Sequence, residues 1–264
     1  MNKIRIKCPA KINLSLKVIN KREDGFHNIE SIMQTVSLFD YLDIKVCECE
    51  ENTIVLSGNS KNIPYDRSNL VYKAAELFLN TLDIQNKKIE IFVEKNIPVS
   101  AGLGGGSADA SGTLYGLNEL FGKKLNSAEL HDLCAKLGSD LNVCLEGGRL
   151  KSCGRGEIIQ KLPFEKFNLS IIKPISLGIS AKEAYTKFSL KNKTSKRNDF
   201  VNDLEWAVID DYEELKFIKN KYPKAVMTGS GSAYYLIEDE FKEENGFVVI
   251  NNLNAVDYGV KADQ

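Results

Sequence analysis

The sequence predicts a mixed protein of helices and strands, of the α+β or α/β class. Segments in which every second residue is apolar, typical of strands, alternate along the chain with segments that have helical apolar spacing. A glycine-rich stretch, PVSAGLGGGSADASG at 98–112, joins one such strand to one such helix. The 264 residues, 43% of them hydrophobic and 27% charged, can bury a large core in one elaborate domain or in two lobes.

The first half of the chain is predicted to begin with two short strands, because apolar residues alternate with other residues around 4–8 and again around 14–18. Ser68 and Ser107 are candidates to cap the two helices that follow them. The further elements expected here are strands at 36–46, 53–56 and 88–98, helices at 68–82, 107–121 and 127–138, and short strands with turns over 139–157.

The second half continues the alternation of both element types. A strand is expected to end at Pro174, since proline breaks the hydrogen-bonding pattern of a sheet. The polar, basic stretch KNKTSKRND at 191–199 is predicted to be a mobile loop. The elements expected are a strand at 168–174, helices near 180–188 and 203–220, and strands at 225–229, 232–238 and 247–251.

Charge and targeting signals limit the partners that we expect. The formal net charge of −1 argues against an electrostatic grip on nucleic acid or on an anionic membrane. Charges interrupt the apolar residues of MNKIRIKCPAKINL at the start, which is neither a signal peptide nor an evident transit peptide. No stretch approaches the roughly 20 apolar residues that span a bilayer. These observations favour a cytoplasmic protein.

The cysteines and histidines do not suggest a metal centre. None of the six cysteines forms a CxxC pair, and the only histidines are His27 and His131. A zinc framework needs more ligands at closer spacing. We therefore expect reduced, mostly buried thiols and predict no metal-ligating residue.

The glycine-rich stretch has the features of a phosphate cradle. A helix that begins after glycines presents unpaired backbone N–H groups and the positive end of its dipole. Glycine also allows the backbone to approach an anion closely and to adopt positive φ. Four glycines fall within the five positions 102–106. The stretch is therefore predicted to bind phosphate.

Other interpretations of the stretch fit less well. A P-loop would need a lysine after its last glycine, but Ser107 stands five positions after Gly102 and no lysine follows. The dinucleotide fingerprint would find Ser107 in place of its third glycine, and Glu119 lies in a predicted helix instead of at a strand end. A tight turn without a ligand is the remaining alternative, although so many glycines make it entropically costly.

Three stretches taken together resemble the motifs of the GHMP kinase superfamily: PAKINLSL at 9–16, PVSAGLGGGSADAS at 98–111 and MTGSGSAYYL at 227–236. Their order along the chain is that of the superfamily. The resemblance implies a two-lobed GHMP kinase fold of the α+β class. Its N-terminal ATP-binding domain, like domain 2 of ribosomal protein S5, would cover 1–155, and its ferredoxin-like C-terminal domain 156–264.

Further stretches narrow the resemblance to the branch of this superfamily that acts on a cytidine-diphosphate-linked alcohol. They cover nearly the whole chain and include SNLVYKAA at 68–75, DGFHNIES at 24–31, LGSDLNVCLEGG at 137–148 and GRGE at 154–157. The resemblance implies ATP-dependent phosphorylation of a tertiary hydroxyl, the 2-hydroxyl of a methylerythritol unit. This reaction belongs to the methylerythritol phosphate route to isoprenoid precursors.

The family pattern implies that Lys11 and Asp140 are the catalytic pair. Asp140 would accept or orient the proton of the attacking hydroxyl. Lys11 would favour the charged carboxylate and stabilise negative charge on the transferred group. Taken singly, a lysine on an edge strand and an aspartate in a loop would more often be structural. The family commonly has a proline two residues after this aspartate, where this chain has Asn142.

The resemblance also implies a set of substrate contacts. Phe26, where the family usually has tyrosine, would stack on one face of the cytosine, and Tyr185 on the other. His27 would hydrogen-bond the edge of the base. Asn13 shares a strand face with Lys11 and is expected to contact the substrate hydroxyls. The turn predicted to lie near substrate and loop consists of Gly229, Ser230 and Gly231.

The ATP is expected to bind mainly to the glycine-rich stretch. Asn69 resembles the adenine contact of the family, although a residue at a helix start can be purely structural. Mg²⁺ is implied by the use of ATP and would be held mostly by phosphates. We expect a monomer or weak homodimer. The predicted loop residues are Pro98, Val99, Ser100, Ala101, Gly102, Leu103, Gly104, Gly105, Gly106, Ser107 and Ala108.

Three alternative functions remain at this point. Another kinase of the superfamily, acting on homoserine or mevalonate, would not need the aromatic and histidine residues of Gly25–Phe26–His27. A non-catalytic protein of the same fold would be expected to lack Lys11 or Asp140, and both are present. An oxidoreductase is disfavoured by the incomplete dinucleotide fingerprint.

Overall fold

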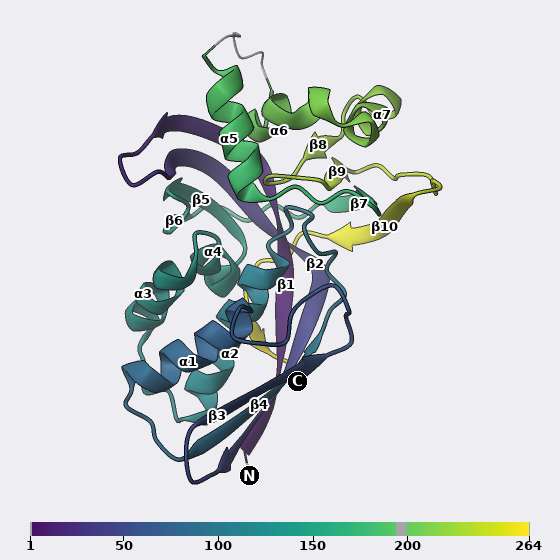
Figure 1. Ribbon diagram of the computed structural model, residues 1–264. Helices are drawn as coiled ribbons and strands as arrows, with labels where there is room; N and C mark the ends of the chain where they lie inside the picture. Colours follow the sequence, from purple (N-terminus) through teal and green to yellow (C-terminus); the bar gives the residue numbers. More distant parts are fainter. Residues whose placement is uncertain (1, 194–199, 264) are drawn as a thin grey trace.

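Two β-sheets organise the chain (Figure 1). This computed structural model describes residues 2–193 and 200–263. Helices α1 (Leu70–Thr81), α2 (Gly105–Leu120) and α4 (Leu141–Glu146) pack on the larger sheet, and α3 (Ser127–Leu137) packs against these three helices. Its strands are β1 (Asn2–Lys21), β2 (His27–Glu48), β3 (Thr53–Gly58), β4 (Lys87–Glu94), β5 (Arg149–Gly154), β6 (Ile158–Lys161) and β11 (Lys261–Ala262).

The smaller sheet is antiparallel and has the order β10–β7–β9–β8. Its strands are β7 (Asn168–Pro174), β8 (Val226–Met227), β9 (Tyr234–Ile237) and β10 (Phe247–Asn254). Together with this sheet, the second lobe contains α5 (Ala181–Lys191), α6 (Asp203–Val208), the 3₁₀ turn η1 (Ile209–Asp211) and α7 (Glu213–Lys221). The expected two-lobed GHMP kinase fold is confirmed, with α+β character in both lobes.

The prediction of two short strands at the start of the chain is wrong, because β1 is one strand of 20 residues. Its middle is covered on both faces, and every residue from Cys8 to Asn13 is buried. Ala10 and Ile12 pack against the second lobe, while Ile6 and Cys8 pack against the helices of the first. Burial on both faces removes the polar–apolar alternation that marks a half-exposed strand.

Other differences from the predicted elements involve short segments. Residues 141–146 form α4 instead of a strand, and six residues are too few to show helical spacing. The helix predicted over 203–220 is interrupted where Tyr212 adopts an extended conformation (φ −131°, ψ 120°). The two-residue strand β11 was not predicted. Residues 194–199 of the predicted loop lie outside the described residues.

The helix caps also differ from the prediction. Asn69, and not Ser68, caps α1, since its side chain accepts a hydrogen bond from the backbone N–H of Val71. Helix α2 begins at Gly105, so Ser107 lies inside its first turn instead of capping it. Ser68 donates its hydroxyl to Asp66.

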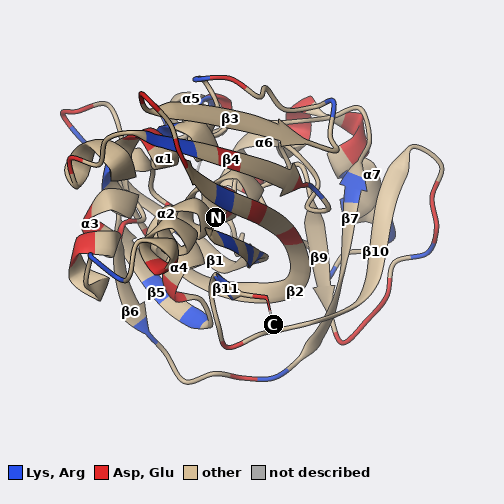
Figure 2. Ribbon diagram, turned by 90° about the horizontal axis from the view of Figure 1, so that it is seen from below, with Lys and Arg blue, Asp and Glu red and all other residues tan. Residues whose placement is uncertain are grey.

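Each lobe contains elements that come from the other half of the chain. Strands β6 and β11 pair within the larger sheet, although both follow residue 155. Leu16 and Val18 of β1 lie in the hydrophobic core of the second lobe. The division at 155/156 stays a prediction. Figure 2 shows acidic and basic residues interspersed along both lobes, and none of the described helices is long and apolar enough to cross a membrane.

Candidate active site

A cleft of about 870 Å³ is lined by residues of both lobes. One end is formed by β1, the glycine-rich stretch and the start of α4, and the other by the β1–β2 hairpin and α5. The cleft brings together most of the predicted catalytic and substrate-binding residues. These are Lys11, Asn13, Phe26, His27, Asp140, Tyr185, Gly229 and Ser230, with Gly102, Gly104 and Ser107 of the glycine-rich stretch.

The glycine-rich stretch has free backbone donors next to this cleft, and three of its residues line the cleft. Ser100, Gly102 and Gly104 all have positive φ, between 54° and 75°. Positive φ at every second residue lets successive backbone N–H groups point into one concavity, which can bind an anion. Within the described residues, the N–H groups of Gly105, Gly106 and Ser107 have no acceptor, as expected for the first turn of α2. The stretch therefore has the local geometry of the predicted phosphate cradle.

Glycine at 102 and 104 is required by close contacts as well as by φ. A Cβ at Gly102 would lie 2.1 Å from the carbonyl oxygen of Thr228. A Cβ at Gly104 would lie 2.9 Å from Cγ of Lys11. The loop is thus pressed against both β1 and the turn at 228–231, which brings the three sequence motifs together.

Lys11 and Asp140 lie side by side in the cleft. The Nζ atom of Lys11 is 3.2 Å from Oδ2 of Asp140. The lysine is 2% exposed, whereas the side chain of Asp140 is 30% exposed and faces the cleft. Asp140 is the N-cap residue of α4, but its carboxylate makes no capping hydrogen bond. The Asp140 carboxylate is therefore accessible to a ligand and is held next to the buried ammonium group of Lys11.

A hydrogen-bond network fixes the lysine. Nζ of Lys11 donates to Oδ1 of Asn13 at 2.8 Å and to the carbonyl of Gly102 at 3.0 Å. Asn13 in turn donates through Nδ2 to Ser31, and its backbone N–H donates to the hydroxyl of Thr228. Thr228 and Ser31 were not predicted as site residues, and only their places within quoted motifs pointed to them. In this structure Asn13 orients Lys11.

The far end of the cleft is aromatic. The rings of His27 and Tyr185 stack with centroids 5.0 Å apart and planes 17° from parallel. Nε2 of His27 lies 2.9 Å from the hydroxyl of Ser189. Burial lowers the pKa of His27, and Lys21 lowers it further. Burial, followed by the charge of Asp140, raises the pKa of Tyr185, which keeps the phenol protonated.

Phe26 is exposed at the mouth of the cleft, next to the aromatic pair. Its side chain is among the exposed large hydrophobic groups, at 51%. The guanidinium of Arg155 lies 5.0 Å from its ring centroid, a cation–π arrangement. Arg155 also lines the cleft, and sequence reasoning missed it, although it stands in the quoted string GRGE.

Some predicted residues lie outside the lining of the cleft. The Asn69 side chain caps α1 and donates to the carbonyl of Pro64 at 2.7 Å, so the structural alternative accounts for its contacts. Gly231 belongs to the turn at 228–231 but does not line the cleft, and a Cβ there would be 2.7 Å from the sulfur of Met227. Asn142 donates to the carbonyl of Glu157. The loop residues without lining atoms are Pro98, Val99, Ser100, Ala101, Leu103, Gly105, Gly106 and Ala108. Their roles stay predictions.

Comparison with known proteins identifies the family. The model for the N-terminal domain of GHMP kinases matches residues 69–148. The chain is 38% identical over 256 residues to 4-diphosphocytidyl-2-C-methyl-D-erythritol kinase of Clostridium tetani, covering 88% of this chain and 90% of the relative. The chain belongs to the 4-diphosphocytidyl-2-C-methyl-D-erythritol kinase family. The phosphotransferase class expected from the motifs is confirmed, and with it the use of ATP.

Solved structures agree with membership of the 4-diphosphocytidyl-2-C-methyl-D-erythritol kinase family. A crystal structure of 4-(cytidine 5'-diphospho)-2C-methyl-D-erythritol kinase superposes with a TM-score of 0.71 at 28% identity, covering 88% of this chain and 89% of the other. Homoserine kinase from Cytophaga hutchinsonii gives the same TM-score at 16% identity and covers 100% and 98%. At that identity the second likeness shows the fold alone.

Proposed function

We propose that this chain uses ATP to phosphorylate the 2-hydroxyl of 4-diphosphocytidyl-2-C-methyl-D-erythritol. The observation that supports this best is the arrangement of one cleft. The Lys11–Asp140 pair lies between the glycine-rich stretch and the aromatic group of Phe26, His27 and Tyr185. A phosphoryl donor and a base-bearing acceptor would each find a suitable surface on opposite sides of that pair.

The reaction needs positioning and charge neutralisation more than covalent chemistry. Asp140 would orient the acceptor hydroxyl and take its proton as the oxygen attacks the γ-phosphorus. The new O–P bond forms as the bond from phosphorus to the ADP oxygen breaks, and ADP leaves with that electron pair. Lys11, held by Asn13 and Gly102, would stabilise the negative charge on the transferred group. The free N–H groups at the start of α2 would bind the phosphates.

Specificity for cytidine would come from the aromatic end. Phe26 offers an exposed ring for base stacking, which contributes about 1–3 kcal/mol per base. His27, whose lowered pKa keeps it neutral near pH 7, would offer a directional hydrogen bond. In this structure His27 covers one face of Tyr185. Tyr185 would therefore hold His27 in place through this stacking contact, in addition to its proposed contact with the base.

A Mg²⁺ ion fits this site if the phosphates supply most of its ligands. No group of three or more His, Cys, Asp or Glu that suits a metal occurs within the described ranges. The Ser107 hydroxyl lines the cleft and offers a hard oxygen ligand of the kind that Mg²⁺ prefers. When bound, the ion would neutralise charge on the triphosphate. We also propose a cytoplasmic monomer or weak homodimer without nucleic-acid or membrane partners, consistent with its net charge of −1.

A parallel substrate assay tests this function. The purified chain is offered ATP and Mg²⁺ with the cytidine-linked alcohol, homoserine or mevalonate, and the product is located by phosphorus NMR. We expect transfer to the cytidine-linked alcohol alone, at its 2-hydroxyl. Phosphorylation of homoserine or mevalonate in its place would overturn the assignment.

The Phe26→Ala variant tests the base contact within the same assay. Loss of stacking should raise KM for the cytidine-linked alcohol by about tenfold or more and leave KM for ATP unchanged. Phe92 is an exposed aromatic residue that does not line the cleft, so it gives the matched control Phe92→Ala. If the two variants behave alike, Phe26 does not contact the base.

A further inference from the structure

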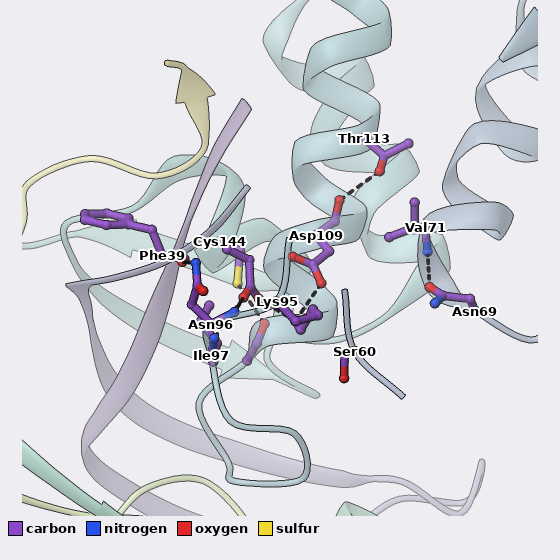
Figure 3. Close-up of polar contacts among 12 residues, drawn as sticks. Phe39, Ser60, Asn69, Val71, Lys95, Asn96, Ile97, Asp109, Thr113 and Cys144 are labelled. Carbon is purple, nitrogen blue, oxygen red and sulfur yellow. Dashed lines mark hydrogen bonds and ion pairs between the residues drawn. The ribbon is translucent and has the colours of Figure 1, made fainter. Parts of the chain in front are cut away.

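Three charged side chains are buried together next to the glycine-rich stretch, and Figure 3 labels two of them, Lys95 and Asp109. They are Lys95, which follows β4, Asp40 of β2 and Asp109 of α2. Their side chains are 5%, 0% and 4% exposed, respectively. None of them lines the cleft or contacts the Lys11–Asp140 pair. The catalytic roles described above therefore leave this cluster unexplained.

Asp40 holds the chain that leads into the stretch. Its Oδ1 atom accepts hydrogen bonds from the backbone N–H groups of Asn96, at 2.6 Å, and Ile97, at 2.8 Å. Pro98 follows immediately and begins the stretch. The other carboxylate oxygen of Asp40, Oδ2, pairs with the ammonium group of Lys95. One carboxylate of β2 thus fixes three consecutive residues at the entrance of the loop.

Lys95 carries this restraint across to α2. Its Nζ atom also donates to Oδ2 of Asp109 at 2.7 Å, and the two side chains point toward each other in Figure 3. A Cβ at Gly105 would lie 3.1 Å from the same Nζ atom, so the ammonium group is against the first turn of α2. The lysine therefore joins the entrance of the loop, at 95–97, to the helix at its exit.

Of the three charged residues, Asp109 has the least complete set of charge and hydrogen-bond partners. Two carboxylates share one ammonium group, and Oδ1 of Asp109 has no partner within the described residues. Burial raises the pKa of Asp109 to about 7, with Asp40 adding to the effect of burial and Lys95 opposing it. Replacing a buried ion cluster by apolar residues is often neutral or stabilising, so stability alone is a poor explanation for it.

We propose that Lys95, Asp40 and Asp109 are positioning residues that fix the glycine-rich stretch in its phosphate-binding shape and thereby set the affinity for ATP. The cluster does not touch the reacting atoms. It acts through the backbone of residues 96–97 and through the first turn of α2. This proposal rests on the proposed function in one respect, namely that the stretch binds the triphosphate.

Two substitutions of Asp109 separate positioning from general stability. Asp109→Leu removes the acceptor on α2 but leaves Lys95 and Asp40 as a balanced pair, so the fold should be retained. Asp109→Asn keeps an oxygen acceptor for Lys95 and serves as the conservative rescue. We expect Asp109→Leu to raise KM for ATP at least about tenfold, with kcat within about threefold of wild type and KM for the acceptor unchanged. Asp109→Asn should stay within about threefold in all three constants.

A stability-matched control completes the test. Leu133→Ala in α3 leaves a cavity in the core of the first lobe and should lower the melting temperature without changing KM for ATP. A wild-type KM for ATP in Asp109→Leu would overturn the proposal. So would equal changes in kcat and both KM values, or a rise in KM for ATP in Leu133→Ala as large as that in Asp109→Leu. If Asp109→Leu does not fold, Asp109→Ala removes the same acceptor without adding volume.

Direct binding distinguishes this proposal from the proposed function. The affinity of each variant for a non-hydrolysable ATP analogue with Mg²⁺ is measured by calorimetry, without any acceptor. A weaker affinity in Asp109→Leu, restored in Asp109→Asn, supports the cluster even if the acceptor proves to be a different alcohol. An unchanged affinity contradicts the cluster even if the cytidine-linked alcohol is phosphorylated.

Discussion

At the scale of single residues, Lys11 shows how the site is built. Its ammonium group is nearly inaccessible to solvent, yet it contacts Asn13 on its own strand, Gly102 in the loop and Asp140 at the start of α4. Three elements therefore set its position, and its charge is balanced by one carboxylate. A cation held in this way needs no reorganisation when negative charge develops nearby.

The sequence predicted these individual residues better than it predicted their neighbours. Lys11, Asp140, Phe26 and His27 stand in distinctive motifs and line one cleft. Arg155, Thr228 and Ser31 line or brace the site equally closely and stand in quoted motifs, but nothing within those motifs marked their side chains as site residues. Contacts between segments far apart in the chain place them there, and spacing along the sequence does not report such contacts.

His27 leads to a prediction about pH and stability. Because burial lowers its folded pKa below the usual 6.5, the unfolded chain binds the proton more tightly than the folded one. Its contribution to stability is therefore present above pH 6.5 and is lost as the pH falls toward the lower folded pKa. His27→Phe keeps a ring against Tyr185 and removes the titration. Denaturant unfolding from pH 7.5 to 5 should show a steeper loss of stability in wild type than in this variant.

Parallel curves of stability against pH for wild type and His27→Phe would contradict this account of His27. Phe92→Ala offers a control, because Phe92 is exposed and does not titrate. Its curve should follow that of wild type through the same range of pH.

At the scale of elements, residues 200–203 tie the two lobes together. Asn202 is fully buried, and its Nδ2 atom donates to the carbonyls of Met227 at 2.7 Å and Gly229 at 2.8 Å. Its Oδ1 atom accepts from Leu204 and caps α6. The backbone N–H of Leu16 on β1 donates to the carbonyl of Val201. This segment thus connects the third motif, helix α6 and the strand that carries Lys11.

Asn202→Ala should destabilise the fold strongly, although it removes only one side-chain amide. It removes a helix cap and leaves two buried carbonyls without their donor, at a cost of roughly 2–3 kcal/mol. The free energy of unfolding, measured with urea, checks this value. Asn80 is exposed on α1, so Asn80→Ala should change stability by no more than about 0.5 kcal/mol. A loss in Asn202→Ala no larger than that of Asn80→Ala would contradict the role of the segment.

Long periodic elements were predictable from the sequence, and short or doubly covered ones were not. Helices α1 and α3 each show one apolar face, whereas α2 is buried around most of its circumference, and the predicted positions of all three are confirmed within a few residues. Strand β1 was divided in two because its buried middle lacks alternation, and α4 and β11 are too short for any period. The caps at Asn69 and Gly104 depend on where the chain turns, which single residue types do not determine.

At the scale of the whole molecule, the two lobes share one cleft with two chemically different ends. The end with the glycine-rich stretch, which we propose binds phosphate, belongs to the first lobe, and α5 of the second lobe lies at the aromatic end (Figure 1). In the function that we propose, a donor and an acceptor would be bound at the same time, on either side of the Lys11–Asp140 pair. This arrangement requires the lobes to be held together, as the shared strand β1 does.

Two separate ends predict that two ligands stabilise the protein independently. Cytidine 5'-diphosphate at 100 times its dissociation constant should add about 2.7 kcal/mol, which corresponds to several degrees in melting temperature. ADP with Mg²⁺ should add a second shift on top of the first. Differential scanning fluorimetry measures both. Loss of the cytidine nucleotide's shift in saturating ADP would mean that both ligands occupy one site.

Turnover of Asp140→Asn tests the central claim most directly, namely that the Lys11–Asp140 pair performs the transfer. The variant keeps the shape of the side chain and removes the charge that would accept the proton. We expect kcat for the cytidine-linked alcohol to fall about 10²–10⁴-fold, while ADP with Mg²⁺ still raises the melting temperature as in wild type. The surface variant Asp132→Asn should keep full activity. Near-normal turnover in Asp140→Asn would contradict the account.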